Sequence, residues 1–114
     1  MTKEKIKELL EEKAKGDDIM AEVAQDAIEQ EDALTYLQDV QSHGCQSGAV
    51  SGLIYYTDTH AFYDRHYEEI EEMREEYEGS IGEPLKINGD LKNWFAWFAY
   101  EGRVNDLIEE IENN

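Results

Sequence analysis

The segment HAFYDRHYEEIEEMREEYE, residues 60–78, carries the clearest helical pattern in the chain. Apolar and aromatic side chains recur there at steps of four, four, three and four, which places them on one face of an α-helix. This face consists of Phe62, His66, Ile70, Met73 and Tyr77. The pattern predicts one helix over residues 60–78, capped by Thr57, Asp58 or Thr59 and ended at Gly79.

The same segment is strongly acidic, since seven of the eleven residues from 68 to 78 are glutamates. Like charges four residues apart on a helix repel by about 0.2–0.5 kcal/mol per pair, and burial of the apolar face must offset this repulsion. Carboxylates at that spacing lie about 6 Å apart along the helix axis. We expect two parallel rows of carboxylates on the exposed faces: Asp64, Glu68, Glu72 and Glu76 in one, and Glu71, Glu75 and Glu78 in the other.

The residues before this segment predict three further helical stretches. Thr2 is a suitable N-cap for a helix over residues 3–14, which Gly16 ends. Asp17 or Asp18 then caps a second helix, and the polar run EQED at 29–32 predicts a bend or a restart with Asp32 as the cap. Gly44 is a plausible stop.

Two segments are less clear. Residues 48–56 are rich in small side chains and predict a short buried helix, with a strand as the alternative because LIYY suits one. Residues 80–90 contain Gly82, Pro84 and an Asn-Gly pair, which predict a loop or a short hairpin through 85–87. After this loop Asp90 would cap a helix containing Leu91, Trp94, Phe95 and Phe98 that Gly102 breaks.

Taken together, these patterns predict an all-α fold: one compact acidic domain over residues 1–114, with about five or six helices. The single cysteine, Cys45, has no partner for an internal disulfide. No apolar run typical of a signal peptide or a transmembrane helix occurs, which favours a reduced cytoplasmic setting.

The net charge limits the classes of partner that the protein can bind. The chain has 28 acidic residues and 10 basic ones, for a formal charge of −18, and five of its lysines fall in residues 1–15. Such a charge disfavours direct binding to nucleic acid or to an anionic membrane and favours a basic partner. A second acidic surface is expected from a region without lysine or arginine, at Asp17, Asp18, Glu22, Asp26, Glu29, Glu31 and Asp32.

The search for catalytic chemistry yields no candidate residue. The pair His43 and Cys45 lacks further soft ligands for zinc, and His66-x-x-Glu69 is a single reversed copy of a di-iron motif. We therefore expect no metal site, no cofactor and no enzymatic activity. Among the aromatic residues, Trp97 points away from the face shared by residues 94, 95 and 98, so it is a candidate apolar anchor for a partner.

Two stretches resemble a known family pattern: GCQSGAVSGLIYYTDTHAFYDRHYEEIEE and GEPLKINGDLKNWFAWFAYE, which together span roughly residues 40–101. They resemble small uncharacterised acidic proteins of bacteriophages and mobile elements. The resemblance transfers no catalytic residue, but it implies a phage setting. In charge and size the chain is also similar to anti-CRISPR and antirestriction proteins that mimic DNA.

We therefore expect an inhibitor of a host defence nuclease that occupies a basic nucleic-acid-binding surface, with the carboxylates of 60–78 in place of phosphates. A CRISPR effector is the first choice of partner, because its nucleic-acid channels are rich in lysine and arginine; a restriction enzyme is the second. The alternative is a non-enzymatic helical adaptor that binds a protein through an apolar patch around Trp97. A solvated acidic surface that serves solubility or high-salt adaptation also stays open.

Overall fold

The computed structural model describes residues 2–44 and 56–113, which form six helices and no strand. The prediction of an all-α fold is therefore confirmed. Of the short helix predicted over 48–56, residues 48–55 lie outside the described residues, and residue 56 begins the fourth helix. The helices are α1 (Lys3–Lys13), α2 (Ile19–Ile28), α3 (Ala33–His43), α4 (Tyr56–Arg65), α5 (Tyr67–Ile81) and α6 (Gly89–Glu112).

The first three helices begin at predicted caps and α3 ends at the predicted glycine, whereas α1 ends at Lys13, before the predicted stop at Gly16. The side chains of Thr2, Asp18 and Asp32 accept hydrogen bonds from backbone N–H groups in the first turns of α1, α2 and α3, at 2.9–3.2 Å. Helix α3 ends at Gly44, whose φ of 79° is a conformation that favours glycine. Local capping chemistry therefore fixes these boundaries.

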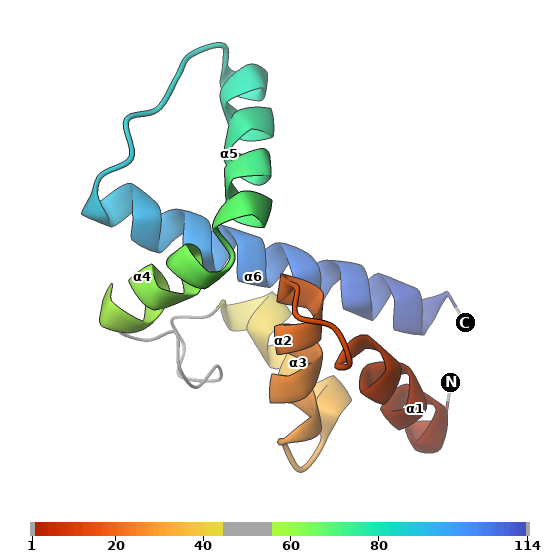
Figure 1. Ribbon diagram of the computed structural model, residues 1–114. Helices are drawn as coiled ribbons and strands as arrows, with labels where there is room; N and C mark the ends of the chain where they lie inside the picture. The colour runs from red at the N-terminus through yellow and green to blue at the C-terminus, as the bar shows by residue number, and fades with distance from the viewer. Residues whose placement is uncertain (1, 45–55, 114) are drawn as a thin grey trace.

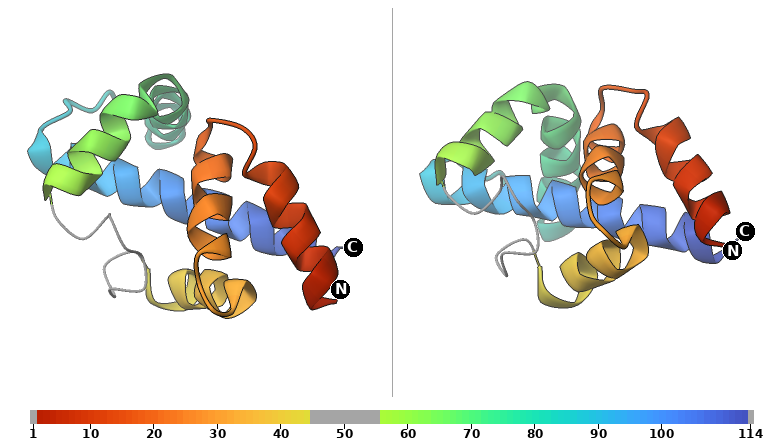
Figure 2. Two further views of the ribbon diagram at one scale, coloured as in Figure 1. Left: turned by 60° about the horizontal axis from the view of Figure 1, so that its bottom comes forward. Right: turned by 90° about the horizontal axis from the view of Figure 1, so that it is seen from below.

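Helix α6 is the axis of the fold. It runs the length of the molecule and packs against α2, α3, α4 and α5, while α1 packs on α2 (Figure 1). Figure 2 shows α4 beside the N-terminal end of α6, α5 nearer its middle and α1 beside its C-terminal end. There Lys13 of α1 forms an ion pair with Glu110 at 3.1 Å. The fully buried side chains around this axis include Leu10, Ile19, Leu37, Phe62, Ile70, Phe95, Tyr100 and Leu107.

The single helix predicted over 60–78 is wrong, because the chain bends at His66. There φ is −117° and ψ is 30°, so α4 ends at Arg65 and α5 starts at Tyr67. The helical hydrogen bonds continue on both sides, from the His66 N–H to Phe62 O and from the Ile70 N–H to His66 O. A one-residue bend leaves the apolar spacing intact, and for this reason periodicity did not reveal it.

The predicted cap at residues 57–59 is also wrong, since α4 begins at Tyr56 and these residues lie inside it. Thr59 is buried, and its hydroxyl donates a hydrogen bond to the side-chain oxygen of Asn93 in α6. A residue type that often caps helices serves here to join two of them.

Three expected boundaries in the C-terminal half also differ. Helix α5 continues through Gly79 and ends at Gly82, where φ is 79°. Asn88, rather than Asp90, caps α6 by accepting the Leu91 N–H at 2.9 Å. Gly102 does not break α6, because glycine weakens a helix without stopping it unless the backbone turns to positive φ.

The loop over residues 82–88 does not form the alternative hairpin, since none of its residues is in a strand. Leu85 and Ile87 are half-buried and pack against the core from this irregular segment. The Leu85 N–H donates to the Glu78 carboxylate, which ties the loop back to α5.

Candidate functional site

Helix α5 projects from the body of the molecule, held at its root by the bend at His66 and at its far end by the loop to α6 (Figure 1). Ile70 is its only fully buried side chain, and Met73 and Tyr77 are half-buried against the core. Most of its surface therefore faces solvent.

One of the two predicted carboxylate rows on α5 is unneutralised. Glu68, Glu72 and Glu76 are all exposed, and within residues 2–44 and 56–113 none of them makes a side-chain ion pair or hydrogen bond. We call these three residues the free row. Glu75, beside the row, is likewise exposed and unpaired among the described residues.

The other predicted row is interrupted by Arg74. Its guanidinium contacts the Glu71 carboxylate and forms an ion pair with Glu78 at 2.8 Å. Glu71 also accepts a hydrogen bond from Tyr63 at 3.0 Å. The hydrogen bond from Arg74 lowers the pKa of Glu71, so its charge is fixed but engaged within the protein.

Asp64 does not extend the free row, because it lies on α4, before the bend. Its carboxylate forms an ion pair with Lys92 of α6 at 2.7 Å. It therefore links α4 to α6, although its side chain stays largely exposed.

The second predicted acidic surface divides in a similar way. Asp18 and Asp32 are helix caps, and Glu22 and Asp26 bond to other helices. Asp17, Glu29 and Glu31 remain exposed. Most of the carboxylates in this set therefore have structural partners.

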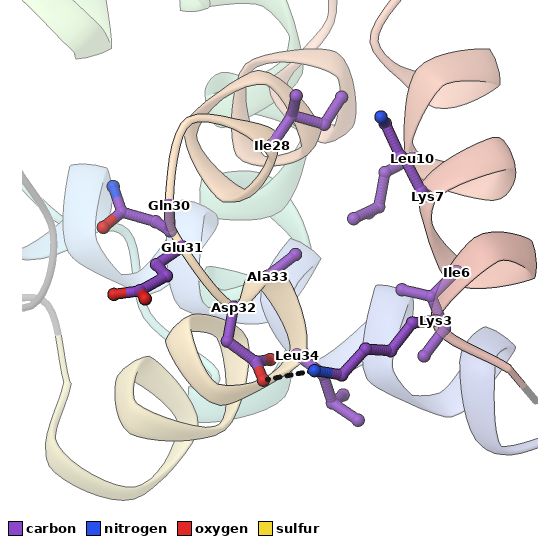
Figure 3. A pocket seen from close by; sticks show the side chains of 10 residues that line it. All are labelled: Lys3, Ile6, Lys7, Leu10, Ile28, Gln30, Glu31, Asp32, Ala33 and Leu34. Carbon is purple, nitrogen blue, oxygen red and sulfur yellow. Dashed lines mark ion pairs between the residues drawn. The ribbon is translucent and has the colours of Figure 1, made fainter.

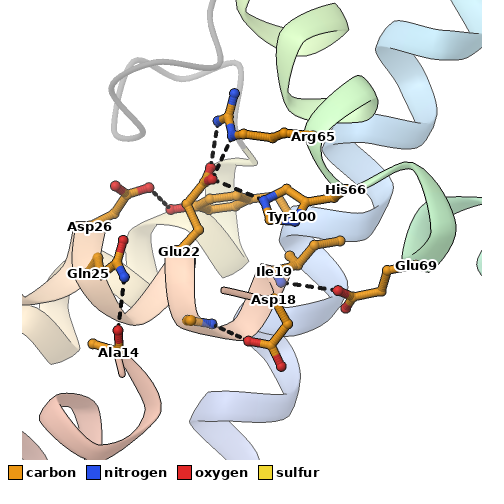
Figure 4. A network of polar contacts seen from close by, with 11 residues as sticks. Ala14, Asp18, Ile19, Glu22, Gln25, Asp26, Arg65, His66, Glu69 and Tyr100 are labelled. Atoms are coloured by element: carbon orange, nitrogen blue, oxygen red, sulfur yellow. Dashed lines mark hydrogen bonds and ion pairs between the residues drawn. The ribbon is translucent and has the colours of Figure 1, made fainter. Parts of the chain in front are cut away.

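The root of α5 is fixed by a polar cluster around Glu22 (Figure 4). Its carboxylate accepts two hydrogen bonds from the Arg65 guanidinium, both at 2.8 Å, and lies 3.0 Å from His66 Nε2. Burial alone would raise the pKa of Glu22, but the hydrogen bonds from Arg65 and His66 lower it below its ordinary value. These contacts hold the bend between α4 and α5 against α2.

A hydroxyl chain continues from this cluster into the core. Tyr36 and Tyr100 bring their hydroxyl oxygens within 2.7 Å, and Tyr100 donates to Asp26 Oδ2 at 2.7 Å. Burial raises the pKa of Asp26 to about 6, although the hydrogen bond from Tyr100 opposes this shift. Burial likewise raises the pKa of the Tyr100 hydroxyl.

Sequence reasoning missed the role of Glu69. Its carboxylate accepts the Ile19 N–H at 3.1 Å, at the first residue of α2, and an Arg103 N–H of α6 at 3.1 Å. No local spacing in the sequence signals this, because its partners lie 50 and 34 residues away.

A pocket of about 290 Å³ lies between α1 and the turn that joins α2 to α3 (Figure 3). Its lining combines Ile6, Leu10 and Ile28 with lysines of α1, and Lys3 reaches Asp32 across it at 3.8 Å. The lining includes two lysines, Lys3 and Lys7, and two acidic residues, Glu31 and Asp32, so it carries balanced charge and does not select a ligand of one sign.

Two of the aromatic residues expected in the core, Trp94 and Phe98, lie at the surface instead. Trp94 and Phe98 are 39 % and 40 % exposed, whereas Phe95 is fully buried. Trp97, the predicted apolar anchor, is only partly exposed and packs against the core. The face assumed to lie in the core is thus split: Phe95 faces inward, and its two neighbours lie at the surface.

Within the described residues, no group of three or more His, Cys, Asp or Glu side chains is arranged to hold a metal ion. His43 is exposed, and His60 contacts the Gly89 carbonyl at 3.0 Å. Cys45 lies outside the described residues. Among the helices of that part of the chain, none has the length and apolar character needed to cross a membrane.

A comparison with protein families finds a match over residues 3–113 to a domain of unknown function, DUF7222. The chain therefore belongs to the DUF7222 family. Comparisons with curated proteins and with solved structures found no match.

Proposed function

We propose that this protein is an inhibitor that binds a basic nucleic-acid-binding surface by mimicking a phosphate strand. The observation that carries the proposal is the free row, which presents three unneutralised carboxylates at regular spacing on a projecting helix. An interval of four residues separates them by about 6 Å along the axis, and phosphates on a nucleic-acid strand are also several ångström apart.

The preferred partner is a CRISPR effector of a phage host, and a restriction enzyme is the runner-up. Both act on DNA through surfaces that must attract phosphate. Encounter would take place in the host cytoplasm and would be accelerated by the charge of −18. The sequence resemblance to acidic phage proteins supports this setting.

The test is binding of the protein to a purified CRISPR effector loaded with its guide RNA, at low and at high salt. The proposal expects tight binding at low salt, steep weakening as salt rises, and competition with target DNA. Binding that is indifferent to salt, or that leaves target DNA bound, would contradict it. The same assay with a restriction enzyme tests the runner-up.

The exposure of Trp94 and Phe98 favours a second candidate, a helical adaptor that docks an apolar partner surface. Substitution of Trp94 by alanine would then abolish binding, and salt would matter little. Trp94 and Phe98 are the more exposed rings and Trp97 is only partly exposed, so Trp97→Phe serves as the control.

A further inference from the structure

Three rings meet where α5 and α6 diverge, and we call Tyr77, Trp94 and Phe98 the aromatic elbow. Trp94 and Phe98 are stacked, with centroids 5.0 Å apart and planes inclined by 14°. Tyr77 of α5 contacts them at 5.4 and 6.2 Å. The rings are thus held in place by both helices while Trp94 and Phe98 remain about two-fifths exposed.

Helix periodicity turns one residue of the free row, Glu76, away from α4, as it does Phe98 of the aromatic elbow. On α5, Glu71 contacts α4, and Glu76 lies five residues later, about 140° around the helix. On α6, Asn93 contacts α4, and Phe98 is again five residues later, about 140° around. Glu76 and Phe98 therefore both face away from α4.

The surroundings of the aromatic elbow are negative. Residues 67–94 contain nine acidic and three basic residues, and two of those bases, Arg74 and Lys92, are engaged in ion pairs. Asp90 is exposed and lies four residues before Trp94 on the same face of α6. This negative field does not stabilise a bound group that is purely apolar. A cation is stabilised both by the field and by contact with the aromatic rings.

Among cations, the guanidinium group fits best. It is planar and weakly hydrated, it stacks on aromatic faces, and it donates hydrogen bonds to carboxylates; the lysine ammonium is compact and strongly hydrated. We infer that the aromatic elbow binds an arginine side chain of the basic partner, stacked on Trp94 and Phe98 and hydrogen-bonded to Glu76. This inference rests on the proposed function, because it identifies the partner's anchoring residue.

The test uses two short peptides of equal length, one of arginines and one of lysines, titrated into the full chain at low salt. The indole N–H signals of Trp94 and Trp97 are followed by NMR. The arginine peptide should bind about two- to fivefold more tightly than the lysine peptide and shift the Trp94 signal. Trp94→Ala should remove this preference, and Trp97→Phe should keep it.

Glu76→Gln provides a second variant that leaves the rings in place, and it should also reduce the preference for arginine. Equal binding of the two peptides, or a shift confined to Trp97, would overturn the inference. If both peptides bound equally and this binding were lost after Glu68, Glu72 and Glu76 were replaced by glutamine, the inference about arginine would fail. The proposed attraction of the free row to a basic surface would still stand. Binding of neither peptide would overturn both.

Discussion

At the residue scale, the position of a glutamate around α5 decides what it does. Glu71 and Glu78 face Arg74, and Glu69 faces α2 and α6, so all three bind within the protein. Glu72 differs from Glu71 by one position along the helix and is unpaired among the described residues. The sequence predicts where the carboxylates gather, but their partners depend on tertiary contacts that spacing alone does not reveal.

Asp26 should make the stability depend on pH in an unusual direction. Burial raises its pKa to about 6 from an ordinary 3.8, so the folded state holds its proton more tightly than the unfolded state. Its contribution to stability is therefore full below about pH 4 and is lost as the pH rises through about 6.

Asp26→Asn, which resembles the protonated form, should remove this loss. The stability of the variant relative to the natural chain should rise by about 1 kcal/mol between pH 4 and pH 7, a discounted value because the carboxyl remains partly exposed. Urea unfolding of both proteins at several pH values measures the difference. A constant difference across that range would show that Asp26 does not titrate as described.

At the element scale, local chemistry predicts helix starts better than helix ends. Thr2, Asp18 and Asp32 cap their helices as expected, because an N-cap needs only a side-chain acceptor and the nearby N–H groups. Glycine is a weaker signal: Gly44 and Gly82 adopt positive φ and end helices, whereas Gly79 and Gly102 stay helical. The bend at His66 rests on contacts with Glu22 from another helix, which no local pattern contains.

Gly79 and Gly82 form a matched pair that tests this distinction. In the described structure an added Cβ meets nothing within 4 Å at either position, so only the backbone conformation differs. Gly79→Ala should stabilise the protein by about 0.5–1 kcal/mol, through helix propensity. Gly82→Ala should destabilise it by about 1 kcal/mol, because φ is 79° there. Thermal unfolding of both variants provides the comparison, and equal effects would contradict the assigned end of α5.

At the scale of the whole molecule, the charge of −18 opposes folding, because the 28 acidic residues far outnumber the 10 basic ones and repel one another. Added salt should screen this repulsion. Raising sodium chloride from low to moderate concentration should stabilise the fold by about 1 kcal/mol, or roughly 4–8 °C in Tm. Scanning calorimetry across the salt series measures this, and a Tm that falls with salt would mean that the internal ion pairs outweigh the repulsion.

The chain also contains a control for the proposed role of the free row. Glu4, Glu8 and Glu12 have the same spacing on α1, but they lie among the five lysines of residues 1–15. Neutralising either set to glutamine removes the same number of charges from an exposed helix. A comparison of the two variants therefore shows whether binding depends on the position of the charges or only on their number.

The most direct test of the central claim compares these two variants for binding to a guide-loaded CRISPR effector at fixed low salt. Replacing Glu68, Glu72 and Glu76 by glutamine should weaken binding by roughly tenfold or more, because three charge contacts are lost. Replacing Glu4, Glu8 and Glu12 should change it by less than about twofold. Equal losses in the two variants, or no loss in the first, would contradict the claim that the free row takes the place of a phosphate strand.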